Sequence, residues 1–328
     1  MTIYIDPPTW PAHGTVFSHL ISDHSLEELH EAAQAAGVSI RAFDRDHYDV
    51  PAHRFDDLVG RGAVPVSGRE LTRILLGCGL RIPAAQRPEK LRRNLTRAWD
   101  RLGAQWDQTR RSAPASGPRE TDDDGPASRL AGADEPWVAL GEELLGRWSE
   151  PHRNYHSLTH LGSVLHGVGA LQRAGELTSQ QRPVVALAAW FHDAVYAGAP
   201  ETDEELSARL AEERLEALLP ASAVAETARL VRLTAHHDPQ TGDRSGAVLV
   251  DADLAVLAQA PEHYSRYVAA VRADYSHVDE EDFRRGRAQV LQRLLAAPSL
   301  FRTATGVQRW EPQARVNLMR ELEQLSRR

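Results

Sequence analysis

The chain has 328 residues, a formal net charge of -8 and one cysteine, Cys78. This length predicts two domains, and a lone cysteine excludes a disulfide-stabilised fold. The longest apolar run, Val184–Phe191, is far shorter than the roughly 18 residues of a membrane helix, and the N-terminus has no secretory signal pattern. We therefore expect a cytoplasmic protein with no membrane partner. The acidic balance disfavours a nucleic-acid partner, and no oligomeric state is indicated.

Histidine is the residue whose number stands out. The chain has 15 histidines, six within residues 1–53 and nine within residues 152–277. Histidine is the commonest metal ligand in proteins and the usual acid or base near neutral pH. The positions of these histidines are therefore the main guide to function.

Residues 1–82 predict a small α/β domain. Thr2–Ile5 and Val38–Phe43 have the composition of short strands. Between them, Ser25 is expected to cap a helix. The apolar stripe of that helix is formed by Leu26, Leu29, Ala33 and Ala36.

Polar side chains crowd into three short segments of this domain. They predict a possible second metal or acid–base site formed by His13, His19, Asp23, Asp46, His47 and Asp49. The competing interpretation is helix capping and turn formation by these Asp and His residues. Residues 1 to about 80 resemble a bacterial family of unknown function, DUF4031, and that resemblance implies no activity.

The middle of the chain predicts a helix and a linker. Residues 83–112 form a basic amphipathic pattern whose apolar face carries Leu91, Leu95, Ala98 and Leu102. Such a face could dock RNA or a partner, but a solvated docking helix is the simpler interpretation. Residues 113–136 are rich in Pro, Gly, Ser and Asp and predict a disordered linker. From 137 to 328 apolar residues recur at helical spacing, which predicts an all-α domain.

In this all-α domain, two segments place polar residues where burial is expected. His156 and His160 are four residues apart and would share one helix face. The segment Pro183–Tyr196 is apolar nearly all round, which predicts a buried helix, yet His192 and Asp193 lie in its middle. An unpaired carboxylate there is costly. A metal ion is the economical partner, because it pairs with the carboxylate and the imidazole at once.

Two later segments show the same conflict between burial and polarity. In the first, the apolar spacing predicts that Thr234 and His237 face inward and that His236 is turned away. In the second, if it is helical, the apolar stripe favours Asp253 over Asp251 as the inward carboxylate, with Asp251 left on the flank.

The order of these residues resembles the HD superfamily of metal-dependent phosphohydrolases, and most of all its predicted members of unassigned substrate. The shared motifs are Tyr-His-x-x-x-His at 155–160, Trp-Phe-His-Asp at 190–193, Thr-x-x-His at 234–237, Asp-Ala-Asp-Leu at 251–254, Phe-x-x-Gly-Arg at 283–287 and Glu-x-x-x-Arg-x-Asn at 311–317. The resemblance implies an HD-type helical fold in which a divalent cation is ligated by His160, His192, Asp193 and Asp253. Two imidazoles and two carboxylates suit Mn²⁺, Fe²⁺, Co²⁺, Ni²⁺ or Zn²⁺ better than Mg²⁺, and we expect Mn²⁺ first.

The resemblance also implies roles for three neighbouring side chains. Tyr-His-x-x-x-His is similar to the signature of cyclic-nucleotide phosphodiesterases, in which the first histidine protonates the leaving oxygen; this makes His156 the candidate general acid, although Ser157 replaces the Asn of that branch. His237 is a candidate for contacting phosphate, and Glu204 for orienting the attacking water. The alternatives are structural or supporting hydrogen bonds for both histidines and an acidic first helical turn for Glu204.

Three arginines are candidates for binding the substrate phosphate, because a guanidinium pairs well with phosphate oxygens. Arg287 and Arg315 stand in the late motifs, and Arg272 is a weaker candidate. All basic residues except Lys90 are arginines, so structural ion pairs such as Glu311 with Arg315 are the competing interpretation.

Together these residues predict an enzyme. It would hydrolyse a phosphoester or phosphoanhydride in a nucleotide or other small phosphorylated metabolite, using metal-activated water. Two alternatives stay open: the HD-type site senses a nucleotide without turnover while other parts of the chain bind a partner, or the N-terminal domain is the principal enzyme. The intact ligand set favours the phosphohydrolase, because a degenerate site is expected to have lost a ligand.

Overall fold

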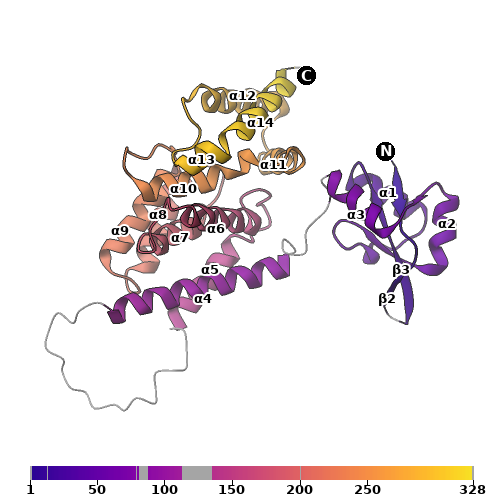
Figure 1. Ribbon diagram of the computed structural model, residues 1–328, viewed down its shortest axis with the longest axis horizontal. Coiled ribbons are helices and arrows are strands. Elements are labelled where there is room, and N and C mark those ends of the chain that lie inside the picture. The colour runs from indigo at the N-terminus through magenta and orange to yellow at the C-terminus, as the bar shows by residue number, and fades with distance from the viewer. Residues whose placement is uncertain are drawn as a thin grey trace, which may run out of the picture. The chain divides into compact units, whose positions relative to one another are not determined.

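The computed structural model describes residues 2–12, 14–78, 80, 88–112, 135–199 and 201–326. The chain divides into two compact units, Met1–Arg87 and Pro88–Arg328, called the sheet unit and the helical unit below (Figure 1). The predicted layout, a small α/β unit followed by a helical one, is confirmed.

The sheet unit is built on its longest strand, β3 (Thr15–Ser22). This strand pairs antiparallel with β2 (Trp10–Ala12), β1 (Ile3–Ile5) and β4 (Tyr48–Pro51). The short strand β5 (Val64–Pro65) lies parallel to β1. Because β3 contacts all three antiparallel neighbours, its side chains occupy the centre of this unit.

Local sequence signals explain the first helix. The predicted cap is present: the Ser25 hydroxyl accepts a hydrogen bond from the backbone N–H of Glu28 at 3.1 Å, at the start of α1 (Leu26–Ala35). Such a cap satisfies one of the N–H groups that a helix start leaves without a partner. The other elements of this unit are the 3-10 turns η1 (Ile40–Ala42) and η2 (Ala52–Arg54) and the helices α2 (Phe55–Gly60) and α3 (Gly68–Gly77).

The strand predicted over Val38–Phe43 is not formed. The 3-10 turn η1 takes its place. The Ser39 hydroxyl accepts a hydrogen bond from the backbone N–H of Arg41 at 3.3 Å, and such a local bond stabilises a turn at the expense of a strand.

Successive residues of β3 enter two different cores. Leu20 packs with α1 on one face of the sheet, whereas Ile21 packs with α3 on the other. This alternation is the two-residue period of a strand. His19 therefore projects from the same face as Ile21, and its register partner on β4 is Asp49.

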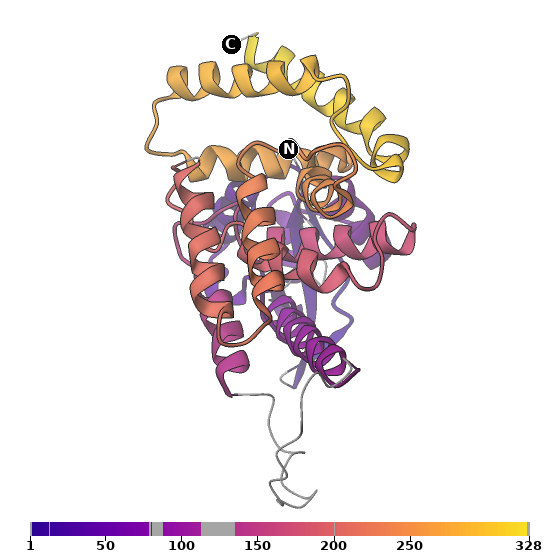
Figure 2. The same ribbon diagram turned by 90° about the vertical axis from the view of Figure 1, so that its left-hand side faces the viewer.

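The helical unit begins with α4 (Pro88–Ser112) and ends with α14 (Glu311–Ser326), and its described residues contain no strand. Between them lie α5 (Glu135–Arg147), α6 (Leu158–Arg173), α7 (Arg182–Phe191), α8 (Thr202–Leu215), α9 (Ala221–Leu233), α10 (Arg244–Leu254), η4 (Ala255–Ala258), α11 (Pro261–Asp274), α12 (Glu280–Ala296) and α13 (Ala304–Arg309). The main core joins α4 to α10, and a smaller core joins η4 to the helices that follow it. Figure 2 shows the yellow helices α12–α14 gathered at one end of the unit. No described helix is long and apolar enough to cross a membrane.

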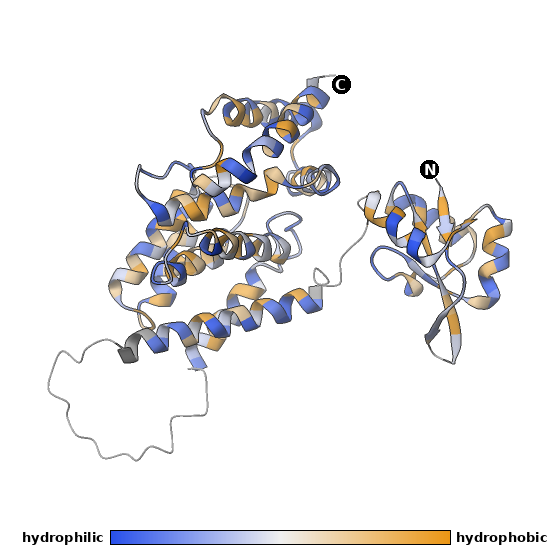
Figure 3. Cartoon of the chain, in the orientation of Figure 1, coloured by the Kyte–Doolittle hydropathy of each residue, from blue (hydrophilic) through white to orange (hydrophobic). Residues whose placement is uncertain are grey.

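Helix α4 joins the main core through its apolar face. Leu95, Trp99 and Leu102 are buried there. The Trp99 ring stacks on Trp137 of α5 with centroids 4.3 Å apart, and each indole N–H donates to the backbone carbonyl of the other residue, at 2.8 and 3.3 Å. Hydrophobic and hydrophilic residues alternate along α4 (Figure 3). Trp99, which the predicted apolar face omitted in favour of Ala98, anchors this helix.

The structure describes part of the predicted basic helix and part of the predicted linker. Residues 83–87 of the predicted basic helix and residues 113–134 of the predicted linker lie outside the described residues. Helix α5 begins at Glu135, two residues inside the predicted linker. Pro136 is well suited to the first turn of a helix, and Trp137 is buried in the main core, so both favour this earlier start.

Candidate metal centre

Four predicted ligands meet where three helices begin or end. His160 lies in the first turn of α6, His192 caps the C-terminus of α7 with Asp193 next to it, and Asp253 lies in the last turn of α10. His160 Nε2 is 3.1 Å from both His192 Nε2 and Asp253 Oδ1. His192 Nε2 is 3.1 Å from Asp193 Oδ2. The two remaining histidine–carboxylate separations are 3.6 and 3.7 Å.

Close backbone packing brings two of these helices together. A Cβ atom on Gly167 of α6 would lie only 3.0 Å from the Cβ of Ala252 of α10. The absence of a side chain at this glycine therefore lets α6 and α10 approach. Because His160 and Asp253 lie on these same helices, the contact also sets their separation.

The buried helix predicted over Pro183–Tyr196 is shorter than expected. Helix α7 ends at Phe191, so His192 and Asp193 lie at its C-terminal end and not in its middle. The Trp148 indole donates a hydrogen bond to the carbonyl of Trp190 at 2.9 Å, which satisfies one of the carbonyls that a helix end leaves open. The chain turns there and aims both side chains at the other donors.

A hydrogen bond to the backbone orients the His192 ring. His192 Nδ1 donates to the carbonyl of Ala189 at 2.9 Å, so this nitrogen carries a proton and Nε2 faces His160. Two unprotonated nitrogens at this distance repel each other unless a proton or a cation lies between them.

The charges of the cluster favour a cation. Burial lowers the pKa of His192, but the neighbouring carboxylates, led by Asp193, outweigh burial and raise it to about 9. Burial lowers the pKa of His160. Burial also works against the charge of Asp193 and Asp253, yet the histidines hold the pKa of both carboxyls below the ordinary value. Two carboxylates with one imidazolium leave a net negative charge inside the protein, which a divalent cation can offset.

The donor spacing also fits a common ion. Two donors that are each about 2.1 Å from an ion lie about 3.0 Å apart at a right angle and about 3.4 Å apart at the tetrahedral angle. The observed separations of 3.1–3.7 Å agree with such an arrangement. His160, His192 and Asp253 form a group that could hold one ion. Asp193 Oδ2 lies 3.6 Å from His160 Nε2 and 3.1 Å from His192 Nε2, beside this group.

His237 lies beside this cluster. Its Nε2 is 2.8 Å from Asp253 Oδ2, so Asp253 contacts His160 with one oxygen and His237 with the other. Helix α9 ends before His237, which adopts a left-handed backbone with φ of 52°. As predicted, His237 contacts the cluster and His236 is exposed. The reason differs from the prediction, because a left-handed turn after the helix, and not a helix face, directs His237 inward.

His156 precedes α6, so it does not share a helix with His160, although the two rings lie 5.9 Å apart. His156 Nδ1 lies 2.9 Å from Asp274 Oδ2, and its ring stacks on Tyr196 at 4.1 Å. The buried Asp274 side chain also accepts from the backbone N–H of Tyr155 at 3.2 Å. Burial raises the pKa of Asp274, but these hydrogen bonds, led by His156, lower it to about 2. An ionised carboxylate thus holds the His156 ring by one nitrogen.

A cavity of about 180 Å³ opens beside the donors. Glu204 of α8 lines it, and its Oε2 atom is buried without a hydrogen-bond partner among the described residues. Burial raises the pKa of this carboxyl. The preceding Asp203 has a different task, since it accepts hydrogen bonds from two backbone N–H groups of the loop before α8, at 2.9 and 2.8 Å. Residues of the lining outside the predicted set include Tyr155, Leu254, Val256, Leu257 and Tyr267.

Arg287 stands behind this cavity. Its Nε donates to the buried Glu321 carboxylate at 2.7 Å, and its Nη2 donates to the Tyr267 hydroxyl at 3.2 Å. The guanidinium therefore supports a wall of the cavity through Tyr267.

Arg315 and Arg272 are engaged in structural contacts. Arg315 Nε donates to Glu311 at 2.6 Å, the pair that was the competing interpretation. Arg272 Nε donates to Glu280 at 3.0 Å. None of the three arginines is among the residues that line the cavity, so the described contacts match ion pairing within the fold.

The expected position of Asp251 on a helix flank is wrong. Its side chain is fully buried and accepts hydrogen bonds from the backbone N–H groups of Arg302 and Thr303 at 2.6 and 2.8 Å. It thereby holds the start of α13. Helix α10 is enclosed on two sides, so both Asp251 and Asp253 point into the protein, and only Asp253 reaches the histidines.

Two residues that build the site carry no visible signal in the sequence. Arg153 donates from Nη1 to the carbonyls of His156 and Asp193, at 3.2 and 2.7 Å, and so joins the two segments. Asp274 lies 118 residues from His156. Arg153 is one of many arginines, and Asp274 reaches the site only in the folded protein. Spacing along the chain therefore reveals neither residue.

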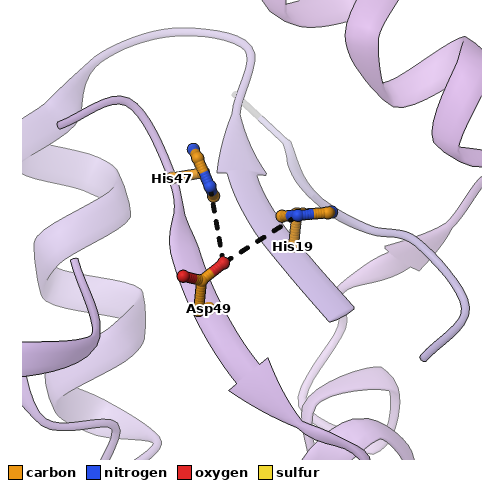
Figure 4. A group of neighbouring side chains, drawn as sticks. All are labelled: His19, His47 and Asp49. Carbon is orange, nitrogen blue, oxygen red and sulfur yellow. Dashed lines mark ion pairs between the residues drawn. The ribbon is translucent and has the colours of Figure 1, made fainter. Parts of the chain in front are cut away.

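The sheet unit brings together three of its six predicted candidates: His19, His47 and Asp49 (Figure 4). Asp46 contacts the Nδ1 atom of His47. Asp23 is engaged elsewhere, since it accepts a backbone hydrogen bond near the start of β1 at 2.8 Å. His13 lies outside the described residues.

Residues 3–77 match the model of a family described as a protein of unknown function (DUF4031). No curated protein and no solved structure matches the chain. The predicted resemblance of the sheet unit is confirmed, and this family supplies no activity. The interpretation of the helical unit rests on its own side-chain geometry.

Proposed function

We propose that the helical unit is a cytoplasmic, metal-dependent phosphohydrolase of the HD type. Its substrate would be a phosphoester or phosphoanhydride in a nucleotide or another small phosphorylated metabolite. The observation that carries the proposal is the convergence of donors from His160, His192, Asp193 and Asp253, with the separations of 3.1–3.7 Å described above. A divalent cation held there, Mn²⁺ first, would offset charge on the phosphoryl oxygens and make water a better nucleophile.

His156 is suited to protonate the leaving oxygen. Asp274 occupies its Nδ1 atom and Tyr196 stacks on its ring, so the ring cannot rotate freely. This leaves Nε2 as the nitrogen available to the cavity that His156 lines. A positioned general acid of this kind contributes about 10²- to 10⁴-fold to a rate.

Glu204 is suited to orient the attacking water. A buried carboxylate oxygen without a partner is costly, and Glu204 Oε2 has none among the described residues. A water molecule in the cavity would supply the missing hydrogen bond. The raised pKa of this carboxyl, caused mainly by burial, also brings it closer to the range of a general base.

The cavity fits the phosphate end of a substrate better than a whole nucleotide. Its volume of about 180 Å³ is smaller than the roughly 300 Å³ at which ordinary ligand pockets begin. Because the candidate arginines are engaged elsewhere, His156 and His237 are the basic side chains of the lining that are not assigned to the ion and can contact phosphate oxygens. The remainder of the substrate would extend toward the opening.

Phosphate release from a panel of nucleotides and sugar phosphates, measured with the full chain and Mn²⁺, tests the proposal. We expect turnover of at least one compound, and loss of that turnover in His192→Ala and Asp193→Ala. The matched control is His166→Ala, an exposed histidine on the same helix as His160, which should keep full activity. Full activity in His192→Ala would refute the proposal.

The same panel separates the two alternatives. A nucleotide that binds tightly and stays intact with Mn²⁺ would favour a sensing role. Turnover that survives in His192→Ala but disappears in His47→Ala would move the activity to the sheet unit.

A further inference from the structure

A second group of histidines and a carboxylate lies on one face of the sheet. His19 of β3 and Asp49 of β4 are register partners on adjacent antiparallel strands. His47 lies just before β4, two residues from Asp49. Figure 4 shows both rings directed at the Asp49 carboxylate.

A buried carboxylate holds each ring from behind. His19 Nδ1 lies 2.9 Å from Asp6 Oδ2, and His47 Nδ1 contacts Asp46 Oδ1. Asp6 and Asp46 are 2% and 1% exposed. A carboxylate that accepts the Nδ1 proton leaves the Nε2 lone pair free to bind, and metal-ligating histidines are held in this way.

The distances from Asp49 to the two imidazole nitrogens exceed that of an ordinary hydrogen bond. Asp49 Oδ1 is 3.5 Å from His47 Nε2 and 3.9 Å from His19 Nε2, whereas an N–H···O bond spans about 2.7–3.2 Å. Two donors on opposite sides of one ion lie about 4.2 Å apart. The three donor atoms lie within 4.8 Å of one another. Closing the widest pair onto one ion therefore needs a movement of up to about 0.6 Å if the two donors lie opposite each other, and up to about 1.4 Å if they meet at the tetrahedral angle.

The group is open on one side. The Asp49 side chain is 46% exposed, His19 is 21% exposed and His47 is 9% exposed. An ion could therefore enter from solvent and keep positions for water or another ligand. The exposed Trp10 ring flanks this side, with its centroid 5.4 Å from that of His19.

We infer that the sheet unit binds a divalent transition-metal ion through His19, His47 and Asp49, with Asp6 and Asp46 orienting the two imidazoles. Two imidazoles and one carboxylate select ions such as Zn²⁺, Co²⁺, Ni²⁺ or Fe²⁺ over Mg²⁺ and Ca²⁺. Three protein donors leave coordination positions open, as in exchangeable or catalytic sites and unlike closed structural ones. This site is separate from the one proposed in the helical unit and does not depend on it.

Calorimetric titration of the metal-free full chain with Co²⁺, followed also by the visible absorption of bound Co²⁺, tests this inference. We expect two classes of sites in the wild type. Asp49→Ala and His19→Ala should each weaken one class at least 100-fold, and His24→Ala, an exposed histidine of the same unit, should keep both. Wild-type binding in both Asp49→Ala and His19→Ala would overturn the inference.

Two further measurements make the result specific. Co²⁺ should quench the fluorescence of Trp10, measured as the difference between the wild type and Trp10→Phe; no such difference would count against a site beside that ring. His192→Ala separates the two proposals, because it should remove only the other class. If His192→Ala binds as the wild type while Asp49→Ala loses a class, the helical site fails and the sheet site stands. Thermal unfolding of the metal-free variants verifies that they are folded.

Discussion

The two histidine–carboxylate clusters are built on different scaffolds. In the helical unit, four side chains come from the ends of α6, α7 and α10, and their donors are 3.1–3.7 Å apart. In the sheet unit, two side chains come from adjacent strands and the third, His47, from the residue before β4, and Asp49 Oδ1 is 3.5 and 3.9 Å from the two imidazole nitrogens. The first cluster is buried beside a cavity, whereas the second is open to solvent.

The difference shows two ways of orienting an imidazole. In the helical cluster a backbone carbonyl, that of Ala189, takes the Nδ1 proton of His192, and both carboxylates are available as donors. In the sheet cluster the buried Asp6 and Asp46 accept the Nδ1 protons of the two histidines. Asp49 is then the single carboxylate in the group of His19, His47 and Asp49 that would bind the ion. We therefore expect the helical site to bind a cation more tightly.

The largest expected effect is on phosphate release, and it should differ between a carboxylate removed from the helical cluster and one removed from the sheet cluster. Asp253→Asn should reduce phosphate release to background, a greater loss than the about 10²- to 10⁴-fold of a missing general acid. Asp49→Asn should leave phosphate release unchanged, because it lies in the other unit. Initial rates at saturating Mn²⁺ measure both. Equal losses in the two variants would break the comparison.

The second effect separates chemistry from metal binding within the helical site. His156→Ala should lower kcat about 100-fold or more while the affinity for Mn²⁺ stays at the wild-type value. A substrate with a better leaving group should recover much of the loss, because it needs less protonation. A loss of Mn²⁺ binding in His156→Ala would instead make that residue a ligand.

His237→Ala, compared with the exposed His236→Ala, should weaken Mn²⁺ binding through Asp253.

The third effect compares the two carboxylates of α10. Asp251→Ala should destabilise the metal-free protein by about 2–3 kcal/mol, because it leaves buried N–H groups without a partner. Asp253→Ala should cost less, since the partners of Asp253 are the imidazoles of His160 and His237, which can lose a proton, whereas a backbone N–H group cannot. Urea unfolding in EDTA measures both. A greater cost for Asp253→Ala would contradict the division of roles.

The smallest effect is a pH dependence at Asp274. Its folded pKa of about 2 is lower than the ordinary value of 3.8, so its stabilising contribution is present above about pH 4 and is lost as the pH falls toward 2. The difference in unfolding free energy between wild type and Asp274→Asn should be about 1–2 kcal/mol at neutral pH. That difference should shrink below pH 4. A difference that does not vary between pH 3 and 7 would show that the hydrogen bonds to His156 and the backbone do not depend on ionisation.

Much of the fold follows from local patterns. The cap at Ser25 and the apolar character of α7 are visible in the sequence because they depend on neighbouring residues. The errors occur where tertiary packing decides. Whether α10 is enclosed on one side or two determines the surroundings of Asp251, and no spacing pattern contains that information.

The candidate site was predictable as a set of residues but not as a geometry. The helix spacing indicated His237, yet a left-handed turn places it. His192 and Asp193 lie at a helix end, where the chain can aim both at once. The pairing of His156 with Asp274 spans 118 residues, so it exists only in the folded protein.

The most direct test of the central claim is anomalous X-ray scattering from crystals of the full chain grown with Mn²⁺. The account predicts a peak within about 2.3 Å of His160 Nε2, His192 Nε2 and an oxygen of Asp253, and its loss in His192→Ala. A fully occupied Mn²⁺ peak elsewhere, with no density among these donors, would contradict it.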